Sequence, residues 1–124
     1  METILLVEDN PGVLALGREI LATAGYTVLE AGTADEALAL SRSGQTIDLV
    51  ITDIVLPGVR GTTLAKKLSL QHPRMKILLT SGYLDSSESG ETTAFEDLPF
   101  LQKPFTSTTL KEKVRAVLDA DRPV

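Results

Sequence analysis

Short apolar runs alternate along this chain with longer segments whose apolar residues recur at helical spacing. The first run, Ile4 to Val7, predicts a buried strand, and the acidic and turn-forming residues from Glu8 to Gly12 end it. Apolar residues then recur at the spacing of one helical face, and Gly25 suits the left-handed position that ends a helix. The residues of this predicted face are Val13, Leu16, Ile20 and Ala24.

A second strand and a second helix follow in the same way. The run from Thr27 to Leu29 is typical of a short strand. Thr33 stands three residues before Glu36, which is the spacing of a capping box at the start of a helix. We therefore expect the second helix to begin there and to reach about Ser43.

The third strand is predicted from Ile47 to Thr52, with Asp53 at its carboxyl end. The pair Pro57-Gly58 marks a turn after it. A third helix follows and should end before Pro73, because the residue that precedes a proline disfavours helical geometry. Its apolar face consists of Leu64, Ala65 and Leu68.

The last third of the chain predicts two more strands and a final helix. The strands are Lys76 to Thr80 and the short Phe100 to Gln102. The apolar side of the final helix carries Leu110, Val114, Val117 and Leu118. Between these strands, Asp85 to Thr93 is rich in Ser, Glu and Gly, so we expect only a short or mobile fourth helix there.

Repeated alternation of strand and helix predicts a parallel sheet, because neighbouring parallel strands need crossover helices. The strands are apolar on both faces, as in a sheet that helices cover on both sides. We therefore expect one α/β domain over residues 1–124, with right-handed crossovers. Its core would be a doubly wound, five-stranded parallel sheet.

Composition narrows the function classes. The 124 residues carry a net charge of −5, which argues against direct nucleic-acid binding because that requires a basic surface. Cysteine is absent, which excludes disulfides, thiolate metal sites and a cysteine nucleophile. Neither a secretory signal nor an apolar run of about 18 residues is present, so we expect a cytoplasmic protein without direct membrane contact.

Polar residues follow the predicted strands at their carboxyl ends, where sheets of this kind place their functional crevice. They are Glu8, Asp9, Asp53, Ser81 and Lys103. Three converging carboxylates repel one another and so favour a bound cation, and hard oxygen ligands suit Mg²⁺ or Mn²⁺. With a lysine and a hydroxyl nearby, this set suits phosphoryl transfer, in which a carboxylate can be the nucleophile.

Four motifs in order resemble the receiver domains of two-component response regulators. They are Leu6 to Asn10, Asp53 to Gly58 with Gly61, Thr80 to Tyr83, and Lys103 to Phe105. Each motif is common by itself, but all four at these spacings are a strong signal that covers nearly the whole chain. The resemblance implies a single receiver domain that accepts phosphoryl groups and is not an enzyme in its own right. It also implies a flavodoxin-like sheet with the strand order 2-1-3-4-5.

The resemblance also implies roles for individual residues. Asp53 would be the phosphoacceptor, Lys103 would pair with the phosphoryl group, and Mg²⁺ or Mn²⁺ would be held by Glu8, Asp9, Asp53 and the backbone carbonyl of Val55. The switch hydroxyl falls on Ser81, because its spacing to Asp53 and Lys103 fits the family and strand alternation lets only one of Thr80 and Ser81 face the crevice. Phe100 occupies the aromatic switch position. Lys103-Pro104 resembles the family's cis peptide bond.

Two positions in receivers flank the path of hydrolytic water, and here they are Val55 and Tyr83. One is apolar and the other bulky, so neither orients water, and we expect slow self-dephosphorylation. The expected partner is a histidine kinase or a histidine phosphotransfer protein. The Thr-Ser-Gly-Tyr motif and the loose segment after it resemble receivers at the C-terminus of hybrid histidine kinases, so the chain could be freestanding or part of a larger sensor kinase.

Other functions remain open from the residues alone. A metal-dependent aspartyl phosphohydrolase would need a second carboxylate at Val55. A flavodoxin-like cofactor binder would need a glycine-rich phosphate cradle where Glu8, Asp9 and Asn10 stand. An interaction scaffold that is never phosphorylated is the third alternative. His72, which precedes Pro73 at a predicted helix end, is expected at the surface without a role.

Overall fold

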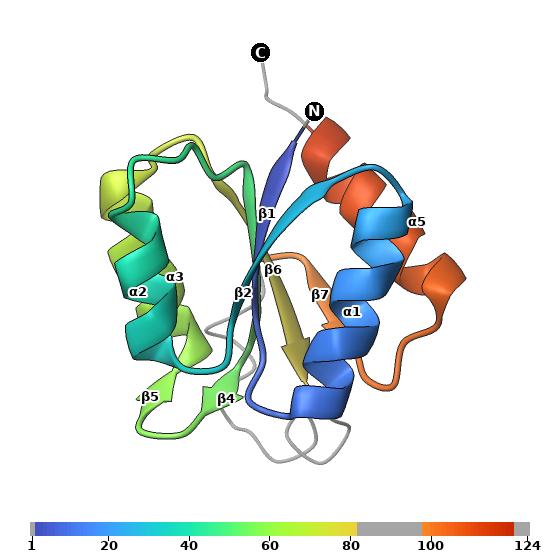
Figure 1. Ribbon diagram of the computed structural model, residues 1–124, viewed down its shortest axis with the longest axis horizontal. Coiled ribbons are helices and arrows are strands. Elements are labelled where there is room, and N and C mark those ends of the chain that lie inside the picture. The colour runs from blue at the N-terminus through green and yellow to red at the C-terminus, as the bar shows by residue number, and fades with distance from the viewer. Residues whose placement is uncertain (1, 82–97, 121–124) are drawn as a thin grey trace.

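The computed structural model describes residues 2–81 and 98–120, and its centre is a parallel five-stranded sheet (Figure 1). The order β2-β1-β3-β6-β7 matches the predicted order 2-1-3-4-5, and every neighbouring pair is parallel. Since each strand begins at the same edge, all the carboxyl ends meet at the opposite edge. The strands are β1 (Thr3–Val7), β2 (Thr27–Ala31), β3 (Leu49–Asp53), β6 (Lys76–Ser81) and β7 (Phe100–Gln102).

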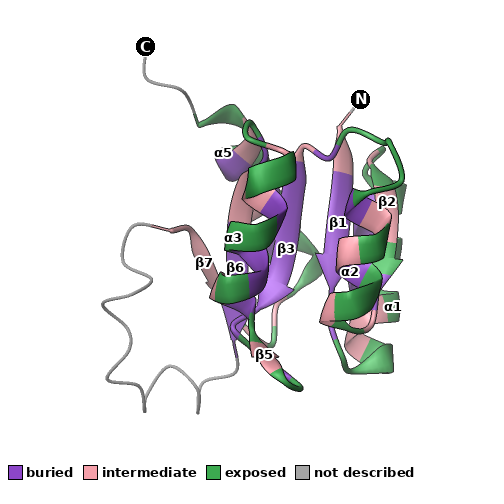
Figure 2. Cartoon of the chain, turned by 90° about the vertical axis from the view of Figure 1, so that its left-hand side faces the viewer, coloured by how far each residue is buried: buried purple, intermediate pink, exposed green. Residues whose placement is uncertain are grey.

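Helices cover both faces of the sheet, as Figure 1 shows, so the predicted doubly wound α/β class is confirmed. One apolar core lies between the sheet and helices α1 (Pro11–Thr23) and α5 (Ser107–Asp119). A second core lies between the other face and helices α2 (Ala34–Ser41) and α3 (Gly61–Gln71). Strands β1 and β3 are buried along almost their whole length (Figure 2), because helices pack on both sides of them.

The prediction of which α1 residues face the core is wrong in part. Leu16 is 49% exposed and Ala24 lies in the exposed C-cap, whereas Gly17 and Leu21 are buried with Ile20. The difference arises at Gly17, because glycine is not counted among the apolar residues that define a predicted helix face. A methyl group there would lie only 3.0 Å from the Leu6 side chain, so the glycine lets α1 pack closely on β1. The predicted end is confirmed, since Gly25 has a φ of 104°.

Helix α2 begins as predicted but ends earlier. Thr33 accepts a hydrogen bond from the Glu36 backbone at its N-terminus. In a complete capping box, the Glu36 carboxylate would accept a hydrogen bond from the backbone N–H of Thr33. Here it accepts from the backbone N–H of the preceding residue, Gly32. The helix ends at Ser41, two residues short of the prediction, because Arg42 caps it and Gly44 takes a φ of 95°.

A small antiparallel hairpin joins β3 to α3. It consists of β4 (Val55–Leu56) and β5 (Val59–Arg60), and the predicted turn at Pro57-Gly58 connects them, with Gly58 at a φ of 82°. The backbone N–H of Gly61 then donates to the Ile54 carbonyl at 2.7 Å. A methyl group at Gly61 would overlap the backbone carbonyl of Asp53, so only glycine permits this close approach.

Several strand bounds differ by one or two residues from the prediction, because backbone pairing extends beyond the apolar run or begins within it. β1 begins at Thr3, β2 extends to Ala31, and β6 extends to Ser81, which therefore ends its strand instead of following it. β3 covers Leu49–Asp53 instead of Ile47 to Thr52.

The other expectations about elements agree with the described residues. Helix α3 buries the predicted face and ends at Gln71, before Pro73, and β7 has the predicted bounds. The peptide bond between Lys103 and Pro104 is cis, as predicted. The predicted fourth helix at Asp85 to Thr93 lies outside the described residues. Within the described parts, no helix is both long and apolar enough to cross a membrane.

Candidate phosphoacceptor site

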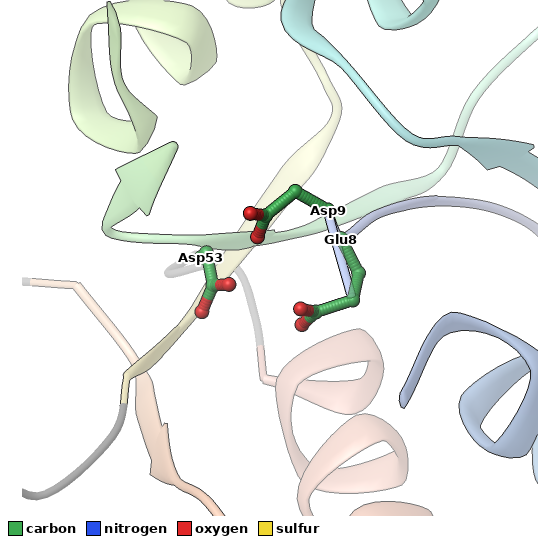
Figure 3. Close-up of side chains that lie close together, drawn as sticks. All are labelled: Glu8, Asp9 and Asp53. Carbon is green, nitrogen blue, oxygen red and sulfur yellow. The ribbon is translucent and has the colours of Figure 1, made fainter. Parts of the chain in front are cut away.

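Three carboxyl groups meet at the carboxyl edge of the sheet, where the sequence predicted them. Glu8 and Asp9 follow β1, and Asp53 is the last residue of β3, two strands that are direct neighbours. Figure 3 shows the three side chains directed toward a common space. One carboxylate oxygen from each lies within 4.8 Å of the others, which makes the group compact enough to share one cation.

The loop after β1 fixes the direction of Glu8. Its backbone N–H continues the pairing with β2 by donating to the Ala31 carbonyl at 3.0 Å. Its carboxylate accepts a hydrogen bond from the backbone N–H of Asn10 at 3.1 Å. Asn10 in turn caps α1, since its side-chain oxygen accepts from Gly12 and Val13. Glu8 is therefore buried and held, while Asp9 beside it is exposed.

Lys103 brings a positive charge into this acidic cluster from the other side. It follows β7, and its backbone N–H donates to the Ser81 carbonyl. Its Nζ lies 2.9 Å from Asp53 Oδ1, 3.0 Å from Asp53 Oδ2 and 3.1 Å from Glu8 Oε1. The side chains of Glu8 and Asp53 are only 4% and 7% exposed, so water screens these ion pairs weakly. One ammonium thus partly neutralises two buried carboxylates.

Burial and charge shift the pKa values of this pair. Burial, reinforced by the negative charge of Glu8, raises the pKa of Asp53 from 3.8 to about 6, although Lys103 and Thr80 act in the opposite direction. Burial alone would lower the pKa of Lys103, but hydrogen bonds and charges from Asp53 and Glu8 outweigh it and raise that pKa. Lys103 is therefore a permanent cation at neutral pH, beside a carboxylate whose negative charge is costly.

The two neighbouring hydroxyls at the end of β6 differ in their contacts. Thr80 is 3% exposed, and its Oγ1 donates to Asp53 Oδ1 at 3.2 Å. Sequence reasoning gave Thr80 no role, so this contact is one that it missed. The contact arises because the register of β3 and β6 pairs Asp53 with Thr80. That register could not be predicted from a local sequence motif. Ser81 is fully buried at the next position, and its contact with a phosphoryl group stays a prediction.

The other predicted residues lie around this site or outside the described chain. Val55 follows Asp53 by two residues in β4, and the residue is 48% exposed. Phe100 is half-buried in β7, paired in register with Leu79 of β6. Tyr83 lies outside the described residues. His72 is half-buried, not simply a surface residue, and its Nε2 lies 2.9 Å from the Ser41 carbonyl, so it links the ends of α2 and α3 away from this site.

The donor set fits a hard divalent cation. Glu8, Asp9 and Asp53 offer oxygen atoms only, and Asp9 is exposed, which leaves room for ligands from solvent. Mg²⁺ is usually held by one or two carboxylates together with water and phosphate oxygens, and Mn²⁺ accepts the same ligands. Residues that suit thiolate- or imidazole-binding metals are absent, since the chain has no cysteine and its single histidine lies elsewhere.

Comparison with known proteins agrees with this geometry. The family model for the response regulator receiver domain matches residues 4–115. The chain is 36% identical over 118 residues to the sensor kinase CckA of Brucella abortus (strain 2308), covering 94% of this chain and 12% of that protein. It is 34% identical over 120 residues to the transcriptional regulatory protein CpxR of Klebsiella pneumoniae, covering 95% of this chain and 50% of that protein. The chain thus spans half or less of the length of these relatives.

Solved structures give the same result for the fold. The crystal structure of the receiver domain from the hybrid histidine kinase CckA superimposes with a TM-score of 0.78 at 34% identity, covering 94% of this chain and 99% of that one. A CheY-like receiver domain protein from Methanospirillum hungatei JF-1 gives 0.83 at 32% identity, covering 96% and 94%. Sequence motifs, sheet order and the family match agree, and this chain belongs to the response regulator receiver domain family.

Proposed function

We propose that this receiver domain accepts a phosphoryl group on Asp53 and acts as a switch in a two-component phosphorelay. The observation that carries the proposal is the position of Asp53, a buried carboxylate in direct contact with the Lys103 ammonium and beside two further acidic groups. With a pKa of about 6, Asp53 is ionised at neutral pH despite its burial, so its carboxylate is available as a nucleophile. Lys103 is placed to pair with the negative charge that a phosphoryl group adds.

The proposed transfer is a displacement at the phosphorus atom. An oxygen of Asp53 forms a bond to the phosphorus of a phosphohistidine, the P–N bond breaks, and its electron pair stays on the imidazole nitrogen. Lys103 then pairs with the phosphoryl oxygens, and Glu8, Asp9, Asp53 and the backbone carbonyl of Val55 would hold Mg²⁺ or Mn²⁺. The bound ion would neutralise charge on the carboxylates and phosphoryl oxygens. The phosphodonor would be a histidine kinase or a histidine phosphotransfer protein.

The switch itself is proposed to involve β6 and β7. The new phosphoryl group adds negative charge and acceptor oxygens at the sheet edge. Ser81 would turn to donate to it and leave space for the half-buried Phe100 ring, so that phosphorylation favours one of two arrangements of these strands. A shift from a mostly inactive to a mostly active population requires about 5 kcal/mol of preference.

The similarity to CckA, named as a hybrid histidine kinase, supports a place inside a larger cytoplasmic sensor kinase, and the similarity to CpxR supports a regulator with a separate output. In both cases the domain is a phosphoacceptor and does not turn over a substrate. A phosphohydrolase is less well supported, because its second carboxylate would have to stand where Val55 lies.

The test is phosphoryl uptake by the wild-type chain and by Asp53→Asn, with acetyl phosphate or a phosphorylated histidine kinase as donor and Mg²⁺ present. The wild type should gain the mass of one phosphoryl group, and Asp53→Asn should gain none while its circular dichroism stays native. The matched control is Asp48→Asn at the opposite, amino-terminal end of β3, which should take up phosphate like the wild type. Labelling of Asp53→Asn at the wild-type rate would refute the assignment.

A further inference from the structure

Thr80 makes a contact with Asp53 that the proposed function does not use. The two residues are register partners on β6 and β3, and the backbone N–H of Ile54 donates to the Thr80 carbonyl at 2.9 Å. Thr80 is 3% exposed, so the hydroxyl has a fixed position on a central strand. From that position its Oγ1 donates to Asp53 Oδ1 at 3.2 Å.

This contact makes the two oxygens of Asp53 unequal. Oδ1 accepts from Thr80 and also lies 2.9 Å from Lys103 Nζ, whereas Oδ2 contacts the same ammonium at 3.0 Å. Oδ2 is therefore the oxygen better placed to form the bond to phosphorus. When it does so, Oδ1 becomes the carbonyl oxygen of the acyl phosphate and still faces the Thr80 hydroxyl.

We propose that the Thr80 hydroxyl, by its direct contact with Asp53, shortens the lifetime of the phosphorylated state, an inference that rests on the proposed function. A hydrogen bond to an ionised carboxylate is about twice as strong as one to a neutral carbonyl. Thr80 therefore stabilises free Asp53 more than it stabilises the acyl phosphate. The hydroxyl favours return to the unphosphorylated state.

The chemical step explains the direction of the effect. In hydrolysis a water oxygen forms a bond to phosphorus, the P–Oδ2 bond breaks, and its electron pair returns to the carboxylate. One water proton passes to solvent, and inorganic phosphate leaves. Half of the returning negative charge develops on Oδ1, where Thr80 donates, so the hydroxyl stabilises the leaving group. In the reverse sense, the same bond makes the free carboxylate a weaker nucleophile during uptake.

The experiment measures how long the phosphoryl group stays on the full chain after loading with acetyl phosphate and Mg²⁺ and removal of the donor. Thr80→Val keeps the β-branched shape and loses the hydroxyl, and its phosphoryl half-life should be several-fold to about tenfold longer than that of the wild type. Its initial uptake should be equal or faster. Thr80→Ser restores a hydroxyl and should return the half-life to near the wild-type value.

The matched control is Thr52→Val, because Thr52 is equally buried in β3 but its hydroxyl donates to the backbone carbonyl of Asp53. Its half-life should stay unchanged. Thr80→Ala replaces Thr80→Val if the latter does not fold. A half-life in the hydroxyl-free variant equal to or shorter than that of the wild type overturns the inference, as does a failure of Thr80→Ser to restore it. Absence of uptake by the wild type is a separate result, which refutes the proposed function itself.

Discussion

Asp53 shows how much of the chemistry is decided by single side chains. Its carboxylate is buried at the end of β3, and it contacts Thr80 of β6 and Lys103, which follows β7. Val55, two residues later, is 48% exposed, and its side chain offers no polar atom to the site. The resemblance to receivers leads us to expect that this position and that of Tyr83, which lies outside the described residues, flank the path of the water that removes the phosphoryl group.

We predict that Val55→Asn combined with Tyr83→Glu shortens the phosphoryl half-life. Polar groups at these positions could orient water and accept its proton, an assistance worth up to roughly 10²-fold. The measurement is the half-life of phosphorylated protein after removal of the donor. Leu70→Asn is the control, since Leu70 is 84% exposed in the last turn of α3, at the opposite edge of the sheet. An unchanged half-life in the double variant would contradict this role.

The elements themselves were largely predictable, because periodicity reports which residues face a core. The site was predictable for a topological reason: parallel strands end at one edge, so Glu8, Asp53 and Lys103 had to meet there. Two details could not be predicted, because they depend on contacts between residues far apart in the sequence. Gly17 allows the close packing of α1 on β1, and the register of β6 against β3 brings Thr80 to Asp53.

Substitution of Gly61 tests whether the close approach between the start of α3 and the end of β3 is required. Gly61→Ala would place a methyl group on the backbone carbonyl of Asp53, so the end of β3 or the start of α3 must shift. We expect a loss of stability of about 2 kcal/mol or more, measured by urea unfolding, together with slower phosphoryl uptake.

Gly12→Ala is the matched control, because a methyl group there would make an ordinary 3.4 Å contact in the exposed first turn of α1. It should leave stability unchanged or slightly improved. Equal stability of the two alanine variants would show that the approach of Gly61 to Asp53 is not required.

Negative charge concentrated at one edge of the sheet lowers the stability of the whole domain. The folded state holds the Asp53 proton more tightly than the unfolded chain, because the pKa rises from 3.8 to about 6 on folding. Stability therefore falls as pH rises through this interval, and the penalty persists above it. In metal-free buffer at pH 8, Asp53→Asn should be more stable than the wild type by about 1–3 kcal/mol.

Thermal unfolding at several pH values checks this prediction, with the difference between the two proteins shrinking as pH falls from 6 to below 4. Addition of Mg²⁺ should raise the Tm of the wild type by mass action, and by much less in Asp53→Asn, which lacks one of the three carboxylates. A stability difference that is independent of pH, or a wild-type Tm indifferent to Mg²⁺, would argue against a strained acidic cluster that binds a cation.

The most direct test of the account is to identify the residue that carries the phosphoryl group. Wild-type protein loaded with acetyl phosphate and Mg²⁺ can be reduced with borohydride, which converts an aspartyl phosphate to homoserine, and then digested for peptide mass spectrometry. If Asp53 is the phosphoacceptor, homoserine is expected at position 53 alone. Modification at Asp9 or at another carboxylate, with Asp53 intact, would contradict it.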